Sequence, residues 1–351
     1  MTGKPAFANP LVTVTIVTFD SRKYIERCLD SIYEQDYRPI EVIVVDNAST
    51  DGTAELLMEY EDLVRVLYNY ENTGFAAAQN QAIAAGHGEW VLTLNPDVRL
   101  FPGFIERLVE AASSGSGVGT VCGKLLRAAP DLSVPRERRI DSTGIHFTPS
   151  QRHFDRGWNE PDDGRFNTPE YVFGATAAAA LYRREMIEDV SLDGDFFDPD
   201  FFTYREDADI AWRAQLMGWR CLYVPSAMGC HVRRISAANR RSAPPVLRMH
   251  SVKNRFLMRI KNMTGDLYHR HWKSITMRDV LVTGGCLLAE PACLPAFWRL
   301  ACLFPRALAK RREIMKRCTV TDEYMAAWFS EAPASKPLHV PATDHAAVHT
   351  S

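Results

Sequence analysis

Trp90-Val-Leu-Thr-Leu-Asn-Pro-Asp97 is the stretch of sequence that decides the fold. Residues 90–94 are apolar or β-branched, which predicts a buried strand, and the polar triplet Asn95-Pro-Asp97 follows directly. In open α/β sheets, ligands bind just outside the carboxyl ends of the strands. A carboxylate there can hold Mg²⁺ or Mn²⁺ against a diphosphate, because these cations prefer oxygen ligands. The stretch therefore predicts an α/β fold with a phosphate-binding site at Asp97; a simple turn at Asn95-Pro96 is the alternative.

Apolar strands and helical stripes alternate on both sides of this stretch. Strands are predicted over residues 12–18, 40–45, 64–68, 90–94 and 118–126. Helices are predicted over residues 22–35, from Thr53, over residues 75–85 and from Pro102. This alternation is typical of a mainly parallel sheet with helices on both faces. We expect a catalytic domain over residues 10–235, with a nucleotide-binding half (10–126) and an acceptor half (127–235).

The C-terminal third has a different pattern. It predicts helices over residues 236–330 and a disordered tail over residues 331–351, rich in Pro, Ala, His and Thr. Basic residues accompany an apolar stripe between Arg248 and Met263, which favours a helix lying on an anionic membrane surface. Packing of that helix against the domain is the alternative. Prolines and charged residues interrupt the apolar run over residues 280–309, so we expect no membrane-spanning helix.

Composition narrows the class of protein. The net charge of −2 gives no reason to expect a nucleic acid as partner. The eight cysteines include no C-x-x-C pair, which argues against a zinc ribbon and is typical of reduced thiols in a cytosolic protein. Residues 1–10 lack the apolar segment of a signal peptide. We therefore expect a cytoplasmic protein, peripheral on the inner face of the plasma membrane. The oligomeric state is left open.

Several polar residues fall where the predicted strands end. Asp46 ends the second strand and can accept a hydrogen bond from the imide N–H of a uracil or thymine; a turn aspartate is the alternative. Asn72, Gly74 and Asn80 can line a nucleoside pocket, or they can belong to the start of the next helix. His231 is a candidate metal ligand, although a lone histidine is more often structural.

A second acidic group, Glu206-Asp207-Ala-Asp209, precedes a short helical stripe. A helix N-cap explains one of its three acids but not all of them. Like charges that lie close together raise the pKa of a carboxylate, which suits a general base. We therefore predict catalytic carboxylates at Glu206 and Asp207. Trp158 can stack on a sugar, and a loop anchored by its ring explains it equally well.

Taken together, these residues resemble the family 2 glycosyltransferases over residues 12–235. The matching pieces come in the family's order: Val-Thr-Phe-Asp20, Val-Val-Asp46-Asn-Ala-Ser-Thr-Asp51-Gly, Glu-Asn72-Thr-Gly74-Phe-Ala-Ala-Ala-Gln-Asn80, Leu-Asn95-Pro-Asp97, Phe-Gly174-Ala-Thr-Ala, Phe-Phe-Thr-Tyr-Arg-Glu206-Asp207-Ala-Asp209, and His231 with Ser236 five residues later. The resemblance implies a GT-A type fold and an inverting single displacement. In that reaction a base deprotonates an acceptor hydroxyl, which attacks the anomeric carbon of a nucleoside-diphosphate sugar.

The resemblance also implies roles for individual residues. It implies that Asp207 is the base, that Asp46 recognises the nucleobase, and that Asp97, beside Asn95, binds the metal and the diphosphate. It further implies that Thr18 and Asp20 lie at the nucleoside pocket and that Gly174 and Ala175 line the acceptor side. The usual Asp-x-Asp motif is here Asn95-Pro-Asp97, a form similar to rhamnosyltransferases that act on lipid-linked or cell-wall glycans. The Gln-x-x-Arg-Trp motif of processive synthases is absent, which predicts one sugar per encounter.

These features predict a non-processive hexosyltransferase of polysaccharide biosynthesis that uses dTDP-L-rhamnose with Mg²⁺ or Mn²⁺. A UDP-hexose or UDP-galactofuranose is the alternative donor. The expected acceptor is a lipid-linked or cell-surface glycan. A catalytically inactive nucleotide-sugar or glycan binding protein is a second class, against which the intact Asp97 and Asp207 argue. A sugar-nucleotide pyrophosphorylase would need a Gly-rich phosphate loop, which residues 12–24 lack.

Overall fold

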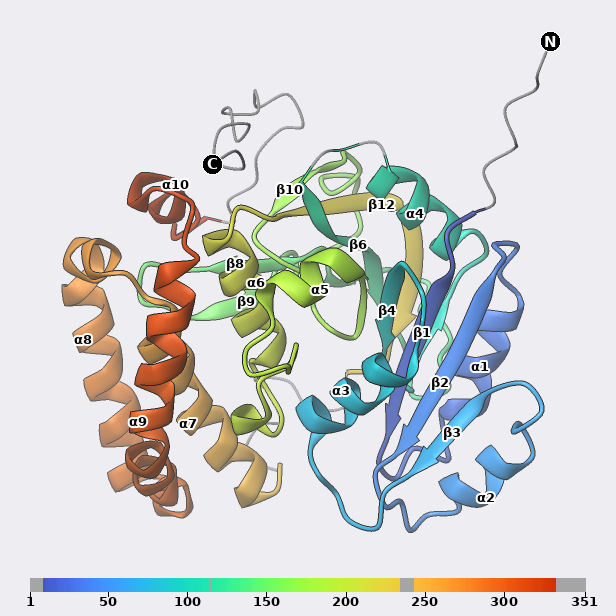
Figure 1. Cartoon of the computed structure of the whole chain (residues 1–351), viewed down its shortest axis with the longest axis horizontal. Coiled ribbons are helices and arrows are strands. Elements are labelled where there is room, and N and C mark those ends of the chain that lie inside the picture. Colours follow the sequence, from blue (N-terminus) through green and yellow to red (C-terminus); the bar gives the residue numbers. More distant parts are fainter. Residues whose placement is uncertain (1–8, 114, 116, 234–242, 333–351) are drawn as a thin grey trace, which may run out of the picture.

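A mixed, mostly parallel β-sheet organises the chain, with helices on both faces and a helical region at the C-terminal end (Figure 1). The computed structural model describes residues 9–113, 115, 117–233 and 243–332. In the first half of the chain the elements are β1 Val12–Thr18, α1 Ile25–Tyr33, β2 Ile40–Asp46, α2 Thr53–Met58, β3 Arg65–Tyr68, α3 Phe75–Ala85, β4 Trp90–Leu94, β5 Val98–Leu100, α4 Phe104–Ser113, β6 Val118–Arg127, β7 Ile140–Ser142, β8 Ile145–Phe147, β9 His153–Asp155 and β10 Glu170–Val172. In the second half they are β11 Ala179–Arg183, α5 Arg184–Val190, η1 Pro199–Phe201, α6 Glu206–Leu216, β12 Arg220–His231, α7 Pro245–Asn262, α8 Gly265–Leu288, η3 Pro291–Cys293, α9 Pro295–Lys316 and α10 Asp322–Ala326.

The sheet has the strand order β10-β12-β6-β11-β4-β1-β2-β3. Strand β1 lies parallel to β2 and β4, and β2 lies parallel to β3, as successive βαβ units require. The register places Thr18 beside Asp46, so the carboxyl ends of β1 and β2 lie together. Strand β11 interrupts the parallel pattern, because it lies antiparallel between β4 and β6. The predicted α/β fold is confirmed, and its GT-A type follows from the comparisons below.

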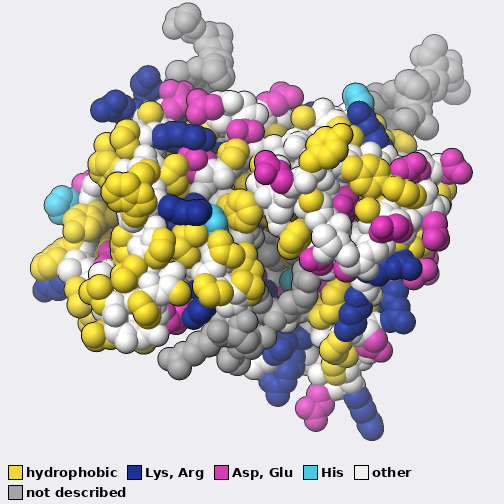
Figure 2. All heavy atoms as spheres, turned by 90° about the horizontal axis from the view of Figure 1, so that it is seen from below, with side chains coloured by type: hydrophobic (Ala, Val, Ile, Leu, Met, Phe, Trp, Pro, Cys, Tyr) yellow, Lys and Arg dark blue, Asp and Glu magenta, His cyan; other side chains and the backbone are white. Residues whose placement is uncertain are grey.

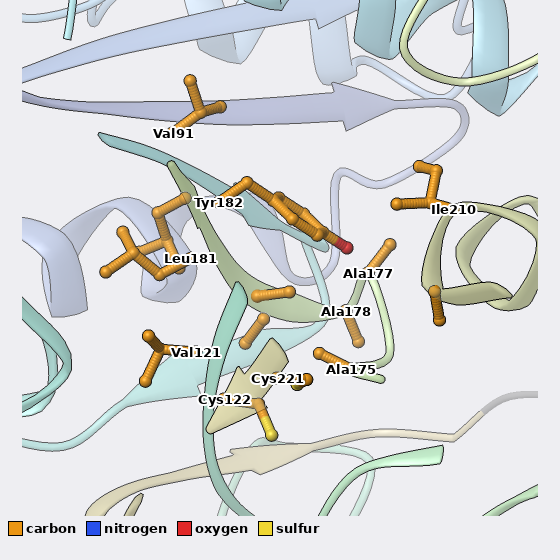
Figure 3. Packing of buried hydrophobic residues seen from close by; sticks show 14 of the residues in the cluster. Val91, Val121, Cys122, Ala175, Ala177, Ala178, Leu181, Tyr182, Ile210 and Cys221 are labelled. Carbon is orange, nitrogen blue, oxygen red and sulfur yellow. The ribbon is translucent and has the colours of Figure 1, made fainter. Parts of the chain in front are cut away.

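Small side chains let helix α6 lie close to the sheet. Tyr182 of β11 is 1% exposed, and its side chain points toward Ala177 and toward Ile210 of α6 (Figure 3). A Cβ atom at Gly174 would lie only 2.2 Å from the Cβ of Ala211, so the backbone before β11 can touch α6 only because residue 174 is glycine. This close packing brings Asp207, in the first turn of α6, next to the backbone of Ala177.

Helix α7 is packed inside the C-terminal region, so the prediction that it lies on a membrane is wrong. Its basic residues Lys253, Arg255, Arg259 and Lys261 are all buried, with at most 6% of each exposed. Arg259 pairs with Asp279 of α8 at 2.6 Å. A basic stripe in a sequence looks the same whether its partners are lipid phosphates or groups of the protein itself. Here the partners are carboxylates and backbone carbonyls from distant segments.

Buried ion pairs hold α6, α7 and α9 together. Lys261 Nζ lies 2.5 Å from Asp198 Oδ2 and 2.9 Å from Asp209 Oδ2. Lys310 Nζ of α9 lies 2.6 Å from Asp198 Oδ1 and 2.8 Å from Asp200 Oδ2. With Arg213, which contacts Asp209 at 3.0 Å, these residues form what we call the helix cluster. The helix cluster consists of Asp198, Asp200, Asp209, Arg213, Lys261 and Lys310.

Within the described residues, one helical stretch is long and apolar enough to cross a membrane. It is Pro291–Lys316, with a mean hydropathy of 1.2 over its most apolar window, of which 17% is buried. Lys310 belongs to the helix cluster, so the C-terminal half of this stretch is tied to the domain. The predicted tail, from residue 333 onward, and the predicted match at Ser236 lie outside the described residues.

Candidate active site

The carboxyl ends of β1 and β2 carry the first group of predicted site residues. Asp46 is 2% exposed, and its Oδ1 accepts hydrogen bonds from Thr18 Oγ1 at 2.7 Å and Ser49 Oγ at 2.6 Å. Its Oδ2 accepts one from the Ser49 amide at 3.0 Å. Asp20 Oδ1 accepts one from the Thr50 amide at 2.8 Å. Asp46 therefore has the hydrogen bonds of a turn aspartate, which was the alternative role expected for it. Recognition of the nucleobase by Asp46 stays a prediction.

The start of α3 contacts the segment that precedes α6. Asn72 Oδ1 accepts a hydrogen bond from the Gly74 amide at 2.9 Å. Gly74 has a φ of +86°, and a Cβ there would lie 2.5 Å from the ring of Phe202, so both backbone and packing require glycine. Asn80 bonds through both ends of its amide to the backbone of Phe197, at 2.7 and 2.9 Å. These contacts are structural, and a role in a nucleoside pocket stays a prediction.

Asp97 lies in the turn between β4 and β5, facing the end of β12. Asn95 opens that turn, and its carbonyl accepts a hydrogen bond from the Val98 amide at 3.1 Å. His231 Nε2 lies 3.4 Å from Asp97 Oδ1, and Nδ1 lies 2.8 Å from Asp141 Oδ2. Burial disfavours the charged imidazolium, but the carboxylates of Asp141 and Asp97 outweigh it and raise the pKa of His231 to about 10. Pairing of β12 with β5 sets this contact.

Contacts between charged groups continue from Asp141 to Asp155, whose carboxylate in turn affects Asp207. Arg233 donates hydrogen bonds to Asp141 Oδ1 at 2.8 Å and to Asp155 Oδ2 at 2.6 Å. Burial, and then the nearby carboxylate of Asp155, raise the pKa of the half-buried Asp207 to about 6. We call this group the site cluster; it consists of Asp97, Asp141, Asp155, Asp207, His231 and Arg233. The site cluster connects the two carboxylates on which the sequence prediction depends.

The segment before α6 has an unusual backbone. Phe202, Tyr204 and Arg205 have φ values of 65°, 69° and 72°, a conformation that costs residues with a side chain of the order of 1–3 kcal/mol each. Burial, and then the neighbouring Asp207, raise the pKa of Glu206 to about 8. Among the described residues, Glu206 Oε2 has no hydrogen-bond partner. Backbone strain and perturbed carboxylates together are typical of a functional site.

Two of the three predicted acceptor residues lie beside the base. Gly174 and Ala175 are buried and line a void with Asp207. The void measures about 10 Å³, which leaves room for one water molecule at most. The amide of Trp158 donates to the carbonyl of Asp155 at 3.1 Å, so this loop is anchored beside the site cluster. Acceptor binding by these residues stays a prediction.

A more open hollow lies beside the site residues rather than among them. It measures about 390 Å³ and lies between α1 and the loop that follows β6. Its lining residues are Lys23, Glu26, Arg27, Pro130, Asp131 and Leu132. None of these is a predicted site residue, although Leu132 packs with Val232, the neighbour of His231.

Asp97 and His231 suit a divalent cation. Because Nδ1 of His231 bonds to Asp141, the lone pair of a neutral imidazole lies on Nε2, toward Asp97, as in many metal-ligating histidines. Two adjacent ligands of an octahedral Mg²⁺, each at roughly 2.1 Å, lie about 3 Å apart, close to the 3.4 Å between Nε2 and Oδ1. No group of three or more potential ligands occurs in the described part of the chain. Phosphate oxygens and water would therefore complete the coordination.

The sequence did not single out Asp141, Asp155 and Arg233. Asp141 is fully buried in β7 and orients both His231 and Arg233. Its only sequence signal is a carboxylate placed between Ile140 and small polar residues. Such a signal is weak, since the partners of Asp141 lie about ninety residues away in the chain.

Comparisons with known proteins identify the family. The model of the family described as Glycosyl transferase family 2 matches residues 13–191. The chain is 33% identical over 238 residues to the Mycobacterium tuberculosis protein named N-acetylglucosaminyl-diphospho-decaprenol L-rhamnosyltransferase, a match that covers 63% of this chain and 76% of that protein.

Two solved structures share the fold. GalNAc-T7 with UDP, GalNAc and Mn²⁺ superposes with a TM-score of 0.58 at 16% identity, over 73% of this chain and 48% of GalNAc-T7. Residues 1–349 of TarS from S. aureus superpose with a TM-score of 0.53 at 17% identity, over 87% of this chain and 86% of the other. At such identities the likeness concerns the fold alone, which is of the GT-A type.

Proposed function

The chain belongs to glycosyl transferase family 2 and transfers a sugar from a nucleotide sugar, and from this premise we propose the finer reaction. One sugar is moved per encounter, with inversion, to a hydroxyl of a lipid-linked or cell-surface glycan. The preferred donor is dTDP-L-rhamnose, which makes the chain a hexosyltransferase. The name of the M. tuberculosis relative supports both the sugar and an acceptor carried on a diphospho-decaprenol lipid.

Asp207 is the proposed general base. Its carboxylate accepts the proton of the acceptor hydroxyl while the hydroxyl oxygen bonds to the anomeric carbon of the donor. The bond from that carbon to the diphosphate oxygen breaks, the electron pair leaves with the diphosphate, and the configuration inverts. With a pKa of about 6, Asp207 is ionised at neutral pH and accepts a proton more readily than an ordinary carboxylate. Glu206, directly before it in the chain, has its own pKa raised to about 8 by burial and by Asp207.

The observation that carries the proposal is the series of charged contacts from Asp97 through His231, Asp141 and Arg233 to Asp155, whose carboxylate raises the pKa of Asp207. Asp97 and His231 would hold Mg²⁺ or Mn²⁺ with the diphosphate, and Asp141 keeps the imidazole oriented. When bound, the cation neutralises negative charge on the leaving diphosphate. The presence of Mn²⁺ with UDP in the GalNAc-T7 structure supports a metal in this fold. Asp46, at the end of β2, would recognise the nucleobase.

A UDP-sugar is the second candidate donor. TarS from S. aureus has been seen with UDP-GlcNAc in the same fold, with a TM-score of 0.52. A UDP-hexose or UDP-galactofuranose would use the same base and the same phosphate site.

The proposed place of action is the cytosolic face of the plasma membrane, with the chain bound peripherally. A polyprenyl-linked acceptor is anchored in a bilayer, so an enzyme that uses it has to reach the membrane surface. Nucleotide sugars are soluble and reach the enzyme from the cytoplasm.

A donor panel tests the proposed function. The purified chain would be incubated with dTDP-L-rhamnose, UDP-glucose, UDP-GlcNAc and UDP-galactofuranose, with an N-acetylglucosaminyl-diphospho-prenol acceptor and with Mn²⁺ or EDTA. We expect dTDP-L-rhamnose to be used best and EDTA to reduce turnover. Preference for a UDP-sugar would mean that the donor is that UDP-sugar and that the choice of dTDP-L-rhamnose is wrong. Binding without turnover of any donor, with Asp207→Asn indistinguishable from the natural chain, would leave only a binding protein.

A further inference from the structure

The α8–α9 hairpin has an apolar tip that the described chain leaves exposed. We use the name hairpin tip for residues 280–298, which comprise the end of α8, η3 and the start of α9. Its exposed side chains are Val280 (66%), Leu281 (59%), Leu287 (60%), Leu288 (90%), Leu294 (37%) and Trp298 (74%). Figure 2 shows apolar side chains gathered on this side of the molecule. Exposed contiguous apolar surface of this kind marks a site of interaction.

Charges around the hairpin tip favour an anionic partner. The tip contains one charged residue, Glu290, and Arg248 pairs with it at 3.2 Å. Asp279, just before the tip, pairs with Arg259 at 2.6 Å. Arg299, just after it, is exposed and has no carboxylate within ion-pair distance among the described residues. The two acidic groups are thus paired with arginines of the chain, while Arg299 leaves positive charge at the rim.

The hairpin tip lies on the same side of the molecule as the candidate active site. In Figure 1 the end of α8 and the start of α9 lie at the lower end of the helical region. Strand β1 enters from the top, so its carboxyl end, with Thr18, also lies at the lower side (Figure 1). A surface that contacts the hairpin tip would therefore also face the site.

We propose that the hairpin tip inserts into the interface of an anionic phospholipid bilayer. An apolar Leu- and Val-rich segment with an exposed Trp, and with the cation Arg299 at its rim, is what such an interface binds. The helix cluster would keep the hairpin fixed to the catalytic domain during insertion, because Lys310 ties α9 to Asp198. The proposal rests on the proposed function in one respect only, namely that insertion would bring a lipid-linked acceptor to the site.

Vesicle co-sedimentation of the full chain tests this docking. The vesicles would be pure phosphatidylcholine, or phosphatidylcholine with phosphatidylglycerol. The double variant Leu288→Glu, Trp298→Glu places charge on the two most exposed tip residues, which pack little in the folded chain. We expect the natural chain to bind the anionic vesicles and the double variant to lose at least about tenfold in partitioning. Leu63→Glu, at a 60% exposed apolar residue beside α2, is the matched control and should bind as the natural chain does.

Other outcomes separate the docking from its rivals. If sedimentation velocity without lipid shows a dimer that the double variant abolishes, and vesicles bind neither protein, the hairpin tip is an interface between two copies and the proposal fails. Sugar transfer to a lipid-free acceptor reports on the proposed function separately. Transfer without vesicle binding would overturn the docking alone, whereas vesicle binding without any transfer would overturn the proposed function alone. Thermal unfolding of each variant confirms that it is folded.

Discussion

The helix cluster and the site cluster are both buried groups of charges, but their charges are balanced differently. In the helix cluster, Asp198 contacts Lys261 and Lys310, and these cations outweigh burial and hold the pKa of Asp198 well below its usual value. In the site cluster, Asp207 has no cation within ion-pair distance among the described residues, and its pKa is raised to about 6. In the helix cluster every aspartate pairs with a cation. In the site cluster, one carboxylate, that of Asp207, has no such partner in the described part of the chain.

This difference indicates what each cluster is for. Buried charges that pair with one another hold helices in register, and removing one partner leaves the other unpaired. A carboxylate that burial disfavours lowers the stability of the fold, so it is expected where its proton transfer serves a reaction. The comparison predicts that substitutions in the helix cluster reduce stability and that substitutions in the site cluster reduce activity.

Asp207→Asn should have the largest effect. The amide cannot accept the proton of the acceptor hydroxyl, so kcat should fall roughly 10²–10⁴-fold. The free energy of unfolding should be unchanged or higher, because the substitution removes a carboxylate that burial disfavours. Steady-state transfer assays and urea unfolding measure the two quantities. Glu188→Gln, an exposed acid on α5, is the control and should change neither. An unchanged kcat for Asp207→Asn would refute the assignment of the base.

Lys261→Met should show the opposite pattern. It removes the cation shared by Asp198 and Asp209 and should lower the free energy of unfolding by about 3–5 kcal/mol. The kcat of the folded fraction should be retained, which transfer assays below the unfolding transition would show. A double variant with Asp209→Asn should lose less stability than the two single losses combined, because the residues share one network. Additive losses would mean that the helix cluster is not a coupled unit.

The same comparison shows what the sequence could predict. Asp46 and Asp97 follow apolar strands directly, so their place at the sheet edge is determined by local pattern, and the structure has them there. Asp207 was predicted from three crowded acids, and one of these, Asp209, belongs instead to the helix cluster. Sequence alone could not separate the two, because α6 presents successive residues to different surroundings.

Long-range pairing marks the limit of prediction. Lys253, Arg255 and Lys261 form a basic stripe, but their partners come from segments far away in the chain, so α7 was assigned to a membrane surface wrongly. Asp141 was missed for the same reason, since only the folded sheet brings it to His231. Local periodicity predicts elements, and it contains no information on which charged residues meet.

Asp141→Asn should weaken metal use without removing the base. It leaves His231 without the carboxylate that orients its ring, and the Mn²⁺ concentration for half-maximal activity should rise about 10–100-fold. Titration of activity with Mn²⁺ measures this shift. Asp162→Asn removes a carboxylate paired with the buried Lys124 at 2.8 Å and serves as control. Asp162→Asn should lower the free energy of unfolding and leave the Mn²⁺ requirement unchanged. If the Mn²⁺ concentration for half-maximal activity rises equally in Asp141→Asn and Asp162→Asn, Asp141 has a structural role alone.

The two clusters should also respond to different ranges of pH. The base acts in its ionised form, so kcat should fall about tenfold per pH unit below the pKa of about 6 and level off above it. The pKa of Asp198 is lowered in the folded chain, so the stability it contributes is present above its unfolded value near 3.9 and is lost as the pH falls below that. Activity should therefore fall before the chain unfolds. A pH–rate profile and unfolding curves from pH 3.5 to 8 would show coincident losses if the comparison is wrong.

Glu313→Gln should have the smallest effect, although it also removes a paired carboxylate. Glu313 lies on the surface of α9, with 51% of its side chain exposed, 3.8 Å from Lys316 and 3.5 Å from Arg317. Water screens such pairs, so the free energy of unfolding should change by less than about 0.5 kcal/mol. Urea unfolding beside Lys261→Met, in the same buffer, makes the measurement. A loss as large as that of Lys261→Met would show that the number of ion pairs, rather than their burial, stabilises the helical region, and the contrast between the clusters would lose its physical basis.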